Sequence, residues 1–246
     1  NPCQASLVIA MKEQLRRIGK IRQLWAKCRQ PGGSTGAAGA ICWKTFLNSY
    51  VNSFVVAQDK TTVSNIFKMF STFYEKLHPS IKPMRKYFVK GTEIVLGNPD
   101  PSAQDQGLES QIRVGEAKNI HVGTGQTLHC IHVSEIARCS SIESIKDALM
   151  PAFSDAPGTI GIIETTAHFA AGSEMFKSMC EKAMKGEGIW EYHFLEWWRM
   201  PEYRMASPMG ETLRLDVEER HLLQTVKGLT LENIMWRRSK INDMDG

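Results

Sequence analysis

The sequence predicts an α/β protein with a mainly parallel sheet flanked by helices. Three observations lead to this class. Short apolar, β-prone runs alternate with segments of helical periodicity along most of the 246 residues. A glycine-rich loop at 27–35 directly follows the first of these runs. A later apolar run ends in Ser134-Glu135, and in a parallel sheet the ends of both runs meet at the carboxyl edge, where ligands bind.

The first strand and the first helix enclose the loop. Residues 21–26 (IRQLWA) are typical of a buried strand, and the small residues at 36–40 lead into a helix. Between them lies KCRQPGGST, at 27–35. The backbone N–H groups of such a loop and of the following helix bind phosphates, and its hydroxyl can bind Mg²⁺. The pattern predicts a P-loop for a nucleoside triphosphate, and a plain glycine turn is the alternative.

The loop departs from the usual G-x-x-x-x-G-K-[ST] pattern. When Gly32 and Ser34 are aligned with it, Lys27 occupies the place of the first glycine and Gly33 that of the lysine. The phosphate-binding cation is therefore expected upstream, at Lys27 or Arg29. Arg29 is preferred because it belongs to the loop itself.

Further strands and helices follow in alternation. The predicted strands are 53–57, 112–117, 127–133 and 159–163. A hairpin is predicted at 87–96, with its turn at Gly91. The predicted helices are 61–77, 173–185, 211–227 and 231–238. The helix at 61–77 has the clearest pattern, with one broad apolar face. Right-handed crossovers favour a parallel sheet, whose carboxyl edge should hold Arg29, Glu135 and Thr165.

Ser134 and Glu135 end the strand at 127–133. In P-loop ATPases the corresponding strand ends in Asp-Glu, where the Asp orders Mg²⁺ and the Glu polarises the attacking water. Glu135 is expected to take the second role. Ser134 can hold a metal-bound water but supplies no charge, so Mg²⁺ should depend more on Ser34 and Glu135. A strand that ends at a solvated glutamate is the alternative.

Composition adds weak constraints. The chain is 42% hydrophobic and carries a net charge of +4, which neither requires nor excludes nucleic acid. It has no apolar run of about 18 residues, so no membrane span or membrane partner is expected. Its six cysteines form no C-x-x-C pair and are interpreted as buried thiols of a reducing cytoplasm. A zinc site from His129, Cys130, His132 and Cys139 is disfavoured. On a strand His129 and Cys130 face opposite sides, His132 shares a face with Cys130, and Cys139 lies past a turn.

A third motif, Glu164-Thr165-Thr166-Ala167, follows the strand at 159–163, and an aromatic stretch, WWRMPEYR, occupies 197–204. The sequence resembles the large terminase subunit of tailed double-stranded DNA bacteriophages. Four features carry the resemblance, in this order: a loop of form K-x-R-Q-x-G-x-S-T, the Ser-Glu pair, the E-[ST]-T-A motif and the aromatic stretch. The resemblance spans roughly residues 4–240. It implies a P-loop NTPase of the ASCE/RecA-like class that hydrolyses ATP with Mg²⁺ to translocate double-stranded DNA into the procapsid.

The resemblance also implies roles for individual residues. The residues implied to bind ATP are Gln4, Lys27, Arg29, Gln30, Gly32, Gly33, Ser34 and Thr35, and those implied to act in catalysis are Arg29 and Glu135. Mg²⁺ would be bound, directly or through water, by Ser34, Ser134 and Glu135. The residues implied to couple hydrolysis to movement are Glu164, Thr165, Thr166 and Ala167. Thr35 is the second choice for the metal. Gln4 would read the adenine edge, and the alternative is that it belongs to a polar N-terminal tail. Thr165 and Thr166 would sense the γ-phosphate, and the alternative is that they are ordinary threonines at the end of a strand.

We expect an ATPase core at 1–194 and a small lid/linker subdomain at 195–246. In the family an RNase H-type nuclease domain follows, and its acidic cluster is not in this sequence, so an ATPase domain or fragment is expected. The implied partners are double-stranded DNA, the portal protein, the small terminase subunit and further copies in a ring, a pentamer by resemblance. The isolated chain is expected to be a monomer. The expected location is the host cytoplasm, with transient docking at the procapsid portal.

The family often carries Gly-Arg-Gly or Gly-Arg-Ser before the second motif, as an arginine finger for a neighbouring subunit. Thr124 occupies that place here, and Arg113, Lys118 or Arg138 are the possible replacements, among which the sequence does not choose. Weak activity as a monomer and stimulation on assembly are therefore expected.

Two other classes stay open. A helicase-like or DNA-repair ATPase should carry a second ATPase-like domain, for which the chain is too short. The other is a degenerate P-loop domain that binds DNA or a partner without turnover. The lysine missing from the loop and the aspartate missing before Glu135 favour it, whereas the presence of Glu135 argues against it.

Overall fold

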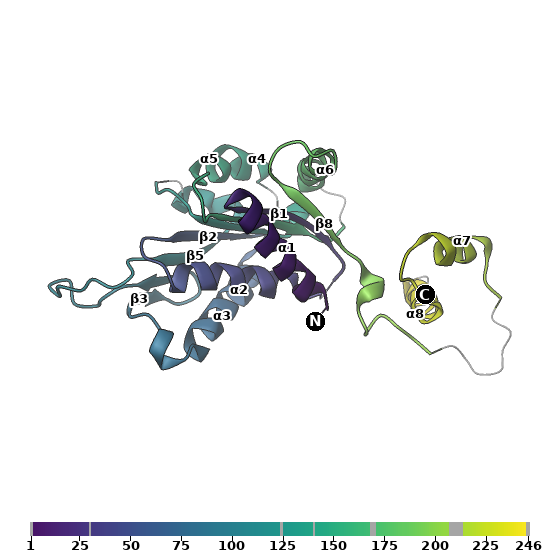
Figure 1. The fold of residues 1–246 in the computed structure, drawn as a ribbon, viewed down its shortest axis with the longest axis horizontal. Coiled ribbons are helices and arrows are strands. Elements are labelled where there is room, and N and C mark those ends of the chain that lie inside the picture. Colours follow the sequence, from purple (N-terminus) through teal and green to yellow (C-terminus); the bar gives the residue numbers. More distant parts are fainter. Residues whose placement is uncertain are drawn as a thin grey trace.

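The structure is a computed structural model that describes residues 2–29, 31–123, 125–139, 141–167, 171–206 and 214–244. In these residues one sheet has the strand order β3-β4-β5-β2-β6-β7-β1-β8, with helices on both faces (Figure 1). Its strands are β1 (Ile21–Lys27), β2 (Asn52–Ala57), β3 (Arg85–Val89), β4 (Glu93–Leu96), β5 (Gln111–Glu116), β6 (Cys130–Ser134), β7 (Ile160–Thr165) and β8 (Glu191–Leu195).

The sheet is mainly parallel, as predicted. Strands β5, β2, β6, β7, β1 and β8 run parallel to one another. The predicted hairpin is β3 and β4, which extends the sheet antiparallel from β5. Every residue of β6 and β7 is buried, which is typical of parallel strands covered on both faces.

The longer helices are α1 (Pro2–Ile18), α2 (Gly33–Phe46), α3 (Lys60–Lys76), α6 (Ala171–Met184), α7 (Val217–Thr225) and α8 (Leu231–Met244). Shorter helical turns are η1 (Pro79–Ile81), η2 (Ala117–Gly123), η3 (Ile136–Arg138), α4 (Ile142–Ser144), η4 (Ile145–Leu149), α5 (Met150–Ala152) and η5 (Trp197–Arg199). Among the described residues, none of the helices has both the length and the apolar character needed to cross a membrane.

Two hydrophobic cores lie on opposite faces of the sheet. Helices α1, α2 and α3 pack on one face, against side chains such as Trp25 of β1. The turns η2 to η4 and helix α6 pack on the other, against side chains such as Leu24. Neighbouring residues of one strand thus serve different cores, as strand alternation requires. The predicted helix at 61–77 is α3, which begins after Asp59, whose Oδ1 accepts from Thr62 N at 2.8 Å.

The structure corrects several sequence-based boundaries. Residues 2–18 form α1, so the polar-tail alternative for Gln4 is wrong. Strand β8 (EYHFL) has no counterpart among the predicted strands. The strand predicted at 127–133 begins only at Cys130, and Leu128 makes an isolated bridge to Phe153. Helix α2 begins at Gly33 rather than at 36, which places the loop hydroxyls in its first turn.

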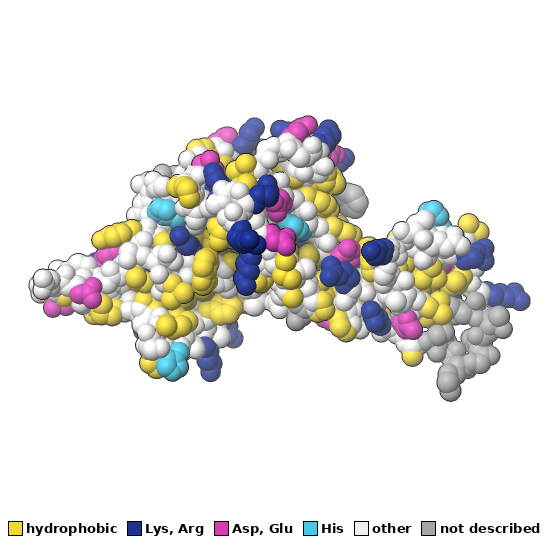
Figure 2. All heavy atoms as spheres, viewed as in Figure 1, with side chains coloured by type: hydrophobic (Ala, Val, Ile, Leu, Met, Phe, Trp, Pro, Cys, Tyr) yellow, Lys and Arg dark blue, Asp and Glu magenta, His cyan; other side chains and the backbone are white. Residues whose placement is uncertain are grey.

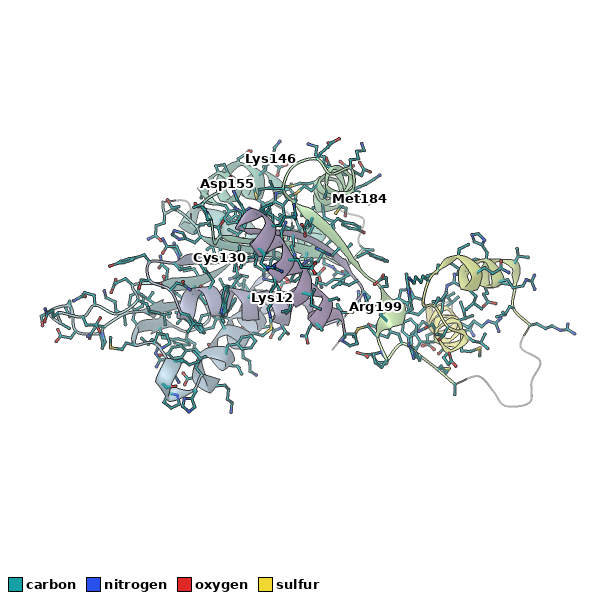
Figure 3. All side chains as sticks on the ribbon, in the orientation of Figure 1. Lys12, Cys130, Lys146, Asp155, Met184 and Arg199 are labelled. Atoms are coloured by element: carbon teal, nitrogen blue, oxygen red, sulfur yellow. The ribbon has the colours of Figure 1, made fainter. Side chains whose placement is uncertain are left out.

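Helices α7 and α8 lie apart from the sheet (Figure 1). The chain reaches them through η5, where Arg199 lies between the two parts (Figure 3). Tyr203 stacks on Trp236 of α8, with ring centroids 4.6 Å apart. On the core side, Met200 is buried in the same cluster as α1. The predicted division at residue 194 falls at the end of β8 and stays a prediction.

Charged side chains are distributed over the surface. In the view of Figure 2, Lys and Arg side chains are scattered over both parts of the molecule and interspersed with acidic ones. This agrees with the balanced net charge of +4.

Candidate functional site

Three neighbouring strands bring the predicted motifs together. Because β7 lies between β6 and β1, the carboxyl ends of these strands place Lys27, Glu135 and Thr165 at one edge of the sheet. Ser134 of β6 is directly in register with Glu164 of β7. The convergence expected from strand alternation is therefore present in the structure.

The loop leads into the N-terminus of α2. Gly32 has φ +76°, a left-handed conformation that favours glycine. A Cβ there would lie 2.5 Å from Gln4 Nε2, so this close approach of α1 also requires glycine. Gln4 Nε2 donates to the Gly32 carbonyl at 3.0 Å. Gly33, Ser34 and Thr35 form the first turn of α2, whose N–H groups lack intrahelical partners and form an anion-binding end.

Lys27, at the end of β1, lies at the centre of the site. Its Nζ is 2.6 Å from Glu135 Oε1 and 3.0 Å from Glu164 Oε2, and its side chain is 7% exposed. Arg29 is exposed, and its carbonyl accepts a hydrogen bond from the Tyr203 hydroxyl. Both cations line the same cavity, and of the two Lys27 is the buried one.

Glu135 is held rigidly in an unusual backbone conformation. Its φ of 54° and ψ of 49° are left-handed, which costs a non-glycine residue about 1–3 kcal/mol and occurs mainly at functional sites. Its Oε2 accepts from Thr166 N at 3.0 Å and from Thr166 Oγ1 at 2.9 Å. Burial alone would raise the pKa of Glu135, but Lys27 and the donors of Thr166 lower it below its usual value. The side chain is therefore an ionised carboxylate.

Glu164 connects the loop to β6. It is fully buried, and its Oε1 accepts from Ser34 Oγ at 2.7 Å and from Ser134 Oγ at 2.9 Å. His132 Nε2 lies 3.3 Å from the same oxygen. Burial, and the nearby charge of Lys27, lower the pKa of His132 to about 3, so this imidazole is neutral. The sequence motif predicted a coupling role for Glu164 and gave no sign of its contact with both serines.

A cavity of about 320 Å³ opens beside these groups and is lined by Lys27, Arg29, Gln58, Glu135, Arg138 and Thr166. Gln58 follows β2 and was missed by the sequence analysis, which had no motif at that strand end. Of the three substitutes for the arginine finger, Arg138 lines this cavity.

The remaining predicted residues take different places. Thr35 Oγ1 donates to Met69 Sδ of α3 at 3.6 Å. Thr165 Oγ1 accepts from Ala137 N at 3.3 Å and so joins β7 to η3. Ala167 lines a neighbouring cavity of about 210 Å³. Gln30 and Thr124 lie outside the described residues.

The cluster considered for zinc is not assembled. His129 Nδ1 accepts from Asn52 N at 3.1 Å, whereas His132 contacts Glu164 on the adjacent strand. Across the part of the chain that the structure describes, no group of three or more His, Cys, Asp or Glu side chains is placed to hold a metal ion. A site for Mg²⁺ would therefore have to combine carboxylates with hydroxyl groups.

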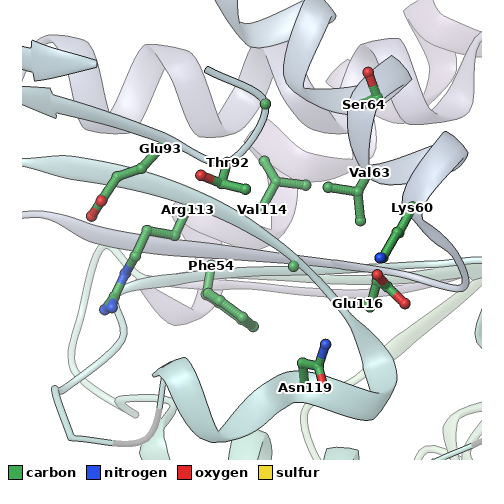
Figure 4. Close-up of a pocket in the computed structure, with 12 residues that line it drawn as sticks. Phe54, Lys60, Val63, Ser64, Thr92, Glu93, Arg113, Val114, Glu116 and Asn119 are labelled. Atoms are coloured by element: carbon green, nitrogen blue, oxygen red, sulfur yellow. The ribbon is translucent and has the colours of Figure 1, made fainter. Parts of the chain in front are cut away.

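A larger cavity, of about 510 Å³, lies elsewhere, between α3 and strands β4 and β5 (Figure 4). Its charged lining residues are Lys60, Glu93, Arg113 and Glu116. Arg113, another substitute for the arginine finger, thus belongs to this cavity rather than to the one at Glu135. None of the residues predicted to bind ATP lines it. The chemistry of phosphate binding points to the smaller cavity.

No family model and no curated protein sequence matches this chain. Solved structures match its fold. The ATPase domain of the Thermus phage P74-26 large terminase is 16% identical, with a TM-score of 0.59 over 76% of this chain and 80% of that one. The HK97 bacteriophage large terminase is 13% identical, with a TM-score of 0.62 over 99% of this chain and 47% of that one.

A third match is the large terminase from a thermophilic bacteriophage, in complex with ADP. It is 10% identical, with a TM-score of 0.50 over 75% of this chain and 45% of that one. This chain spans about half the length of the HK97 protein and of the thermophilic phage protein. It has the fold of phage large terminase ATPase domains, a P-loop NTPase fold, and the predicted fold class is confirmed.

Proposed function

We propose that this chain is the ATPase motor domain of a phage large terminase, which hydrolyses ATP with Mg²⁺ to drive double-stranded DNA into a procapsid. One observation carries the proposal: Lys27, the ionised Glu135 and the N-terminus of α2 meet at one edge of the sheet, beside a cavity of about 320 Å³. The likeness of fold to phage large terminases, one of them in complex with ADP, supports it.

The phosphates are bound by the first turn of α2 and by the cations of the cavity. The free N–H groups of the turn face an anion, and Lys27 and Arg29 neutralise the β- and γ-phosphates. In the structure Lys27 is paired with Glu135 and Glu164. A triphosphate competes for this ammonium group and thereby releases Oε1 of Glu135.

Glu135 orients and polarises the water that attacks the γ-phosphate in line. Its Oε2 stays held by the N–H and hydroxyl of Thr166, so the freed Oε1 is the oxygen that faces the water. The same two hydrogen bonds join Thr166 to Glu135, which supports a role for Thr166 in sensing the γ-phosphate. Thr165 extends this link to η3.

Mg²⁺ fits the donor set at this edge. The hydroxyls of Ser34 and Ser134 and the carboxylate of Glu135 all offer oxygen ligands, which Mg²⁺ prefers. When bound, the ion neutralises charge on the phosphates and fixes their orientation. Ser34 would hold it directly, and Ser134 through a bound water.

The wider assembly belongs to the same proposal. Residues 195–246 act as a lid/linker subdomain, and several copies form a ring on the portal protein, together with the small terminase subunit and DNA. The site is used in the host cytoplasm, during docking at the procapsid. Arg138 lines the cavity from within the chain and supplies a cation there, where the family uses an arginine of the neighbouring subunit.

The test is ATP hydrolysis by the wild type and by Glu135→Gln, with Mg²⁺, across a series of protein concentrations and with DNA added. Glu181→Gln, a half-exposed glutamate on α6, is the matched control. We expect turnover to fall by about 10²-fold or more in Glu135→Gln, with nucleotide binding retained, because a positioned base contributes that much.

Equal turnover in Glu135→Gln and wild type would refute the catalytic assignment. A wild type that binds no nucleotide would refute the proposed function. Nucleotide binding without turnover, even with DNA, would instead favour the degenerate P-loop domain. Turnover per chain that stays constant as the concentration rises would argue against stimulation by assembly.

A further inference from the structure

The end of β6 lacks a carboxylate where the metal of a P-loop ATPase is usually held. Ser134 occupies that position, and its hydroxyl carries no charge. On the adjacent strand β7, Glu164 lies in register with Ser134. Neighbouring strands are about 4.8 Å apart, so a glutamate on β7 can bring its carboxylate to the point that a shorter aspartate on β6 would reach.

The contacts of Glu164 place its carboxylate at that point. A single oxygen, Oε1, accepts both from Ser34 Oγ at 2.7 Å and from Ser134 Oγ at 2.9 Å. These are the two hydroxyls that would hold Mg²⁺. The side chain is fully buried, and its position is fixed by Lys27 at the other oxygen.

We infer that Glu164 is the carboxylate of the metal site, in place of the aspartate that β6 lacks, and that it holds Mg²⁺ directly or through a bound water. This inference rests on the proposed function and assigns its metal ligand. It differs from the coupling role that the sequence motif suggested for Glu164.

The balance of charge agrees with this assignment. Among the described residues, Lys27 is the one cation that forms an ion pair with Glu135 or Glu164, and it is shared between them. When a triphosphate draws Lys27 away, two carboxylates remain close together in a buried setting, which is costly unless a cation replaces the ammonium group. A divalent ion between Glu164 and the phosphates supplies that charge.

A purely structural role for Glu164 makes a different prediction. As a buried support it would fix Lys27 and the two serines, and its loss would weaken nucleotide binding with or without metal. As a metal ligand it matters only when Mg²⁺ is present. In the absence of metal, its negative charge close to the phosphates is unfavourable, so its removal leaves ADP binding unchanged or tighter.

The experiment measures two equilibria in the wild type, in Glu164→Gln and in the exchanged variant Ser134→Asp/Glu164→Gln. One is the affinity for a fluorescent ADP analogue in Mg²⁺ and in EDTA. The other is the affinity of the ADP complex for Mn²⁺, followed by its electron paramagnetic resonance signal. Circular dichroism and thermal unfolding establish that each variant is folded.

We expect Glu164→Gln to lose about 10- to 100-fold in Mn²⁺ affinity, the range seen when groups that support a bound metal are removed. Its ADP affinity in EDTA should be equal to or higher than that of the wild type. The exchanged variant, which returns the carboxylate to β6, should recover most of the Mn²⁺ affinity, and this result remains informative if Glu164→Gln alone does not fold.

Unchanged Mn²⁺ affinity in folded Glu164→Gln, or equal losses of ADP affinity in Mg²⁺ and in EDTA, would overturn the inference and leave the proposed function intact. A folded exchanged variant without Mn²⁺ binding would also overturn it. A wild type that binds ADP under neither condition would overturn the proposed function, and this inference with it.

Discussion

Substitution of Gly32 by alanine tests how the loop is held against α1. Gly32 has φ +76°, and an added Cβ would lie 2.5 Å from Nε2 and 2.9 Å from Cδ of Gln4. Two separate costs follow. Alanine is strained in the left-handed conformation, and the amide of Gln4 must move and lose its hydrogen bond to the Gly32 carbonyl.

The two costs can be estimated separately. A left-handed residue with a Cβ costs about 1–2 kcal/mol. The hydrogen bond contributes about 0.5–1.5 kcal/mol, and the flexible side chain of Gln4 relieves the collision itself. Gly32→Ala should therefore destabilise the fold by about 1.5–3.5 kcal/mol. Each kcal/mol corresponds to about 2–4 °C in Tm in a chain of this size.

Gly186→Ala is the matched control. Gly186 has φ +73°, nearly the same as Gly32, and nothing lies within 4 Å of its added Cβ. It should show only the backbone cost. Urea unfolding of both variants, and of Gln4→Ala alone and with Gly32→Ala, completes a double-mutant cycle.

We expect Gly32→Ala to exceed Gly186→Ala by about 0.5–1.5 kcal/mol, the value of one hydrogen bond, and this excess to vanish in the Gln4→Ala background. ADP affinity should fall in Gly32→Ala and stay unchanged in the control Gly186→Ala. Equal losses at both glycines, or an excess that persists without Gln4, would show that contact with α1 does not constrain the loop.

Two further predictions concern the helices. Asp59→Ala should cost about 1 kcal/mol in urea unfolding. The hydrogen bond from Thr62 N lowers the pKa of Asp59 in the folded state. The difference in unfolding free energy between wild type and Asp59→Ala should therefore be complete above about pH 4 and disappear as the pH falls below it. A constant difference down to about pH 2 would contradict the cap. Glu219→Gln should speed amide hydrogen exchange in α7 about tenfold, because it removes the ion pair in which Arg238 Nε lies 2.6 Å from Glu219 Oε1. Amide exchange in β7 should stay constant and serves as the control.

Much of the fold and part of the site follow from local pattern. The apolar runs of β1, β6 and β7 are long enough to be recognised, and the end of a parallel strand determines the edge at which the next residue lies. Arg29, Glu135 and Thr165 could therefore be predicted to lie at one edge of the sheet, although they are far apart in the sequence. The loop glycines likewise indicated that a helix follows, although α2 begins at Gly33 rather than at 36.

The missing parts depend on tertiary contacts that have no local signature. Helix α1 has a weak apolar stripe, and its packing on the sheet, rather than its sequence, makes Gln4 a partner of Gly32. The buried position of Lys27 and the contacts of Glu164 both depend on the order in which three strands lie side by side. The sequence motif places Glu164 after an apolar run but cannot show which serines lie beside it.

The loop is also connected to the C-terminal helices by a short chain of contacts. The Tyr203 hydroxyl donates to the carbonyl of Arg29, and the Tyr203 ring stacks on Trp236 of α8. Asn233 of α8 donates to the Tyr203 carbonyl at 2.7 Å. Any displacement of the loop backbone at Arg29 therefore either carries Tyr203 and α8 with it or breaks a hydrogen bond. In the proposed function this same loop binds the phosphates, so these contacts would connect phosphate binding to the position of α8, in addition to the Thr165-Thr166 motif.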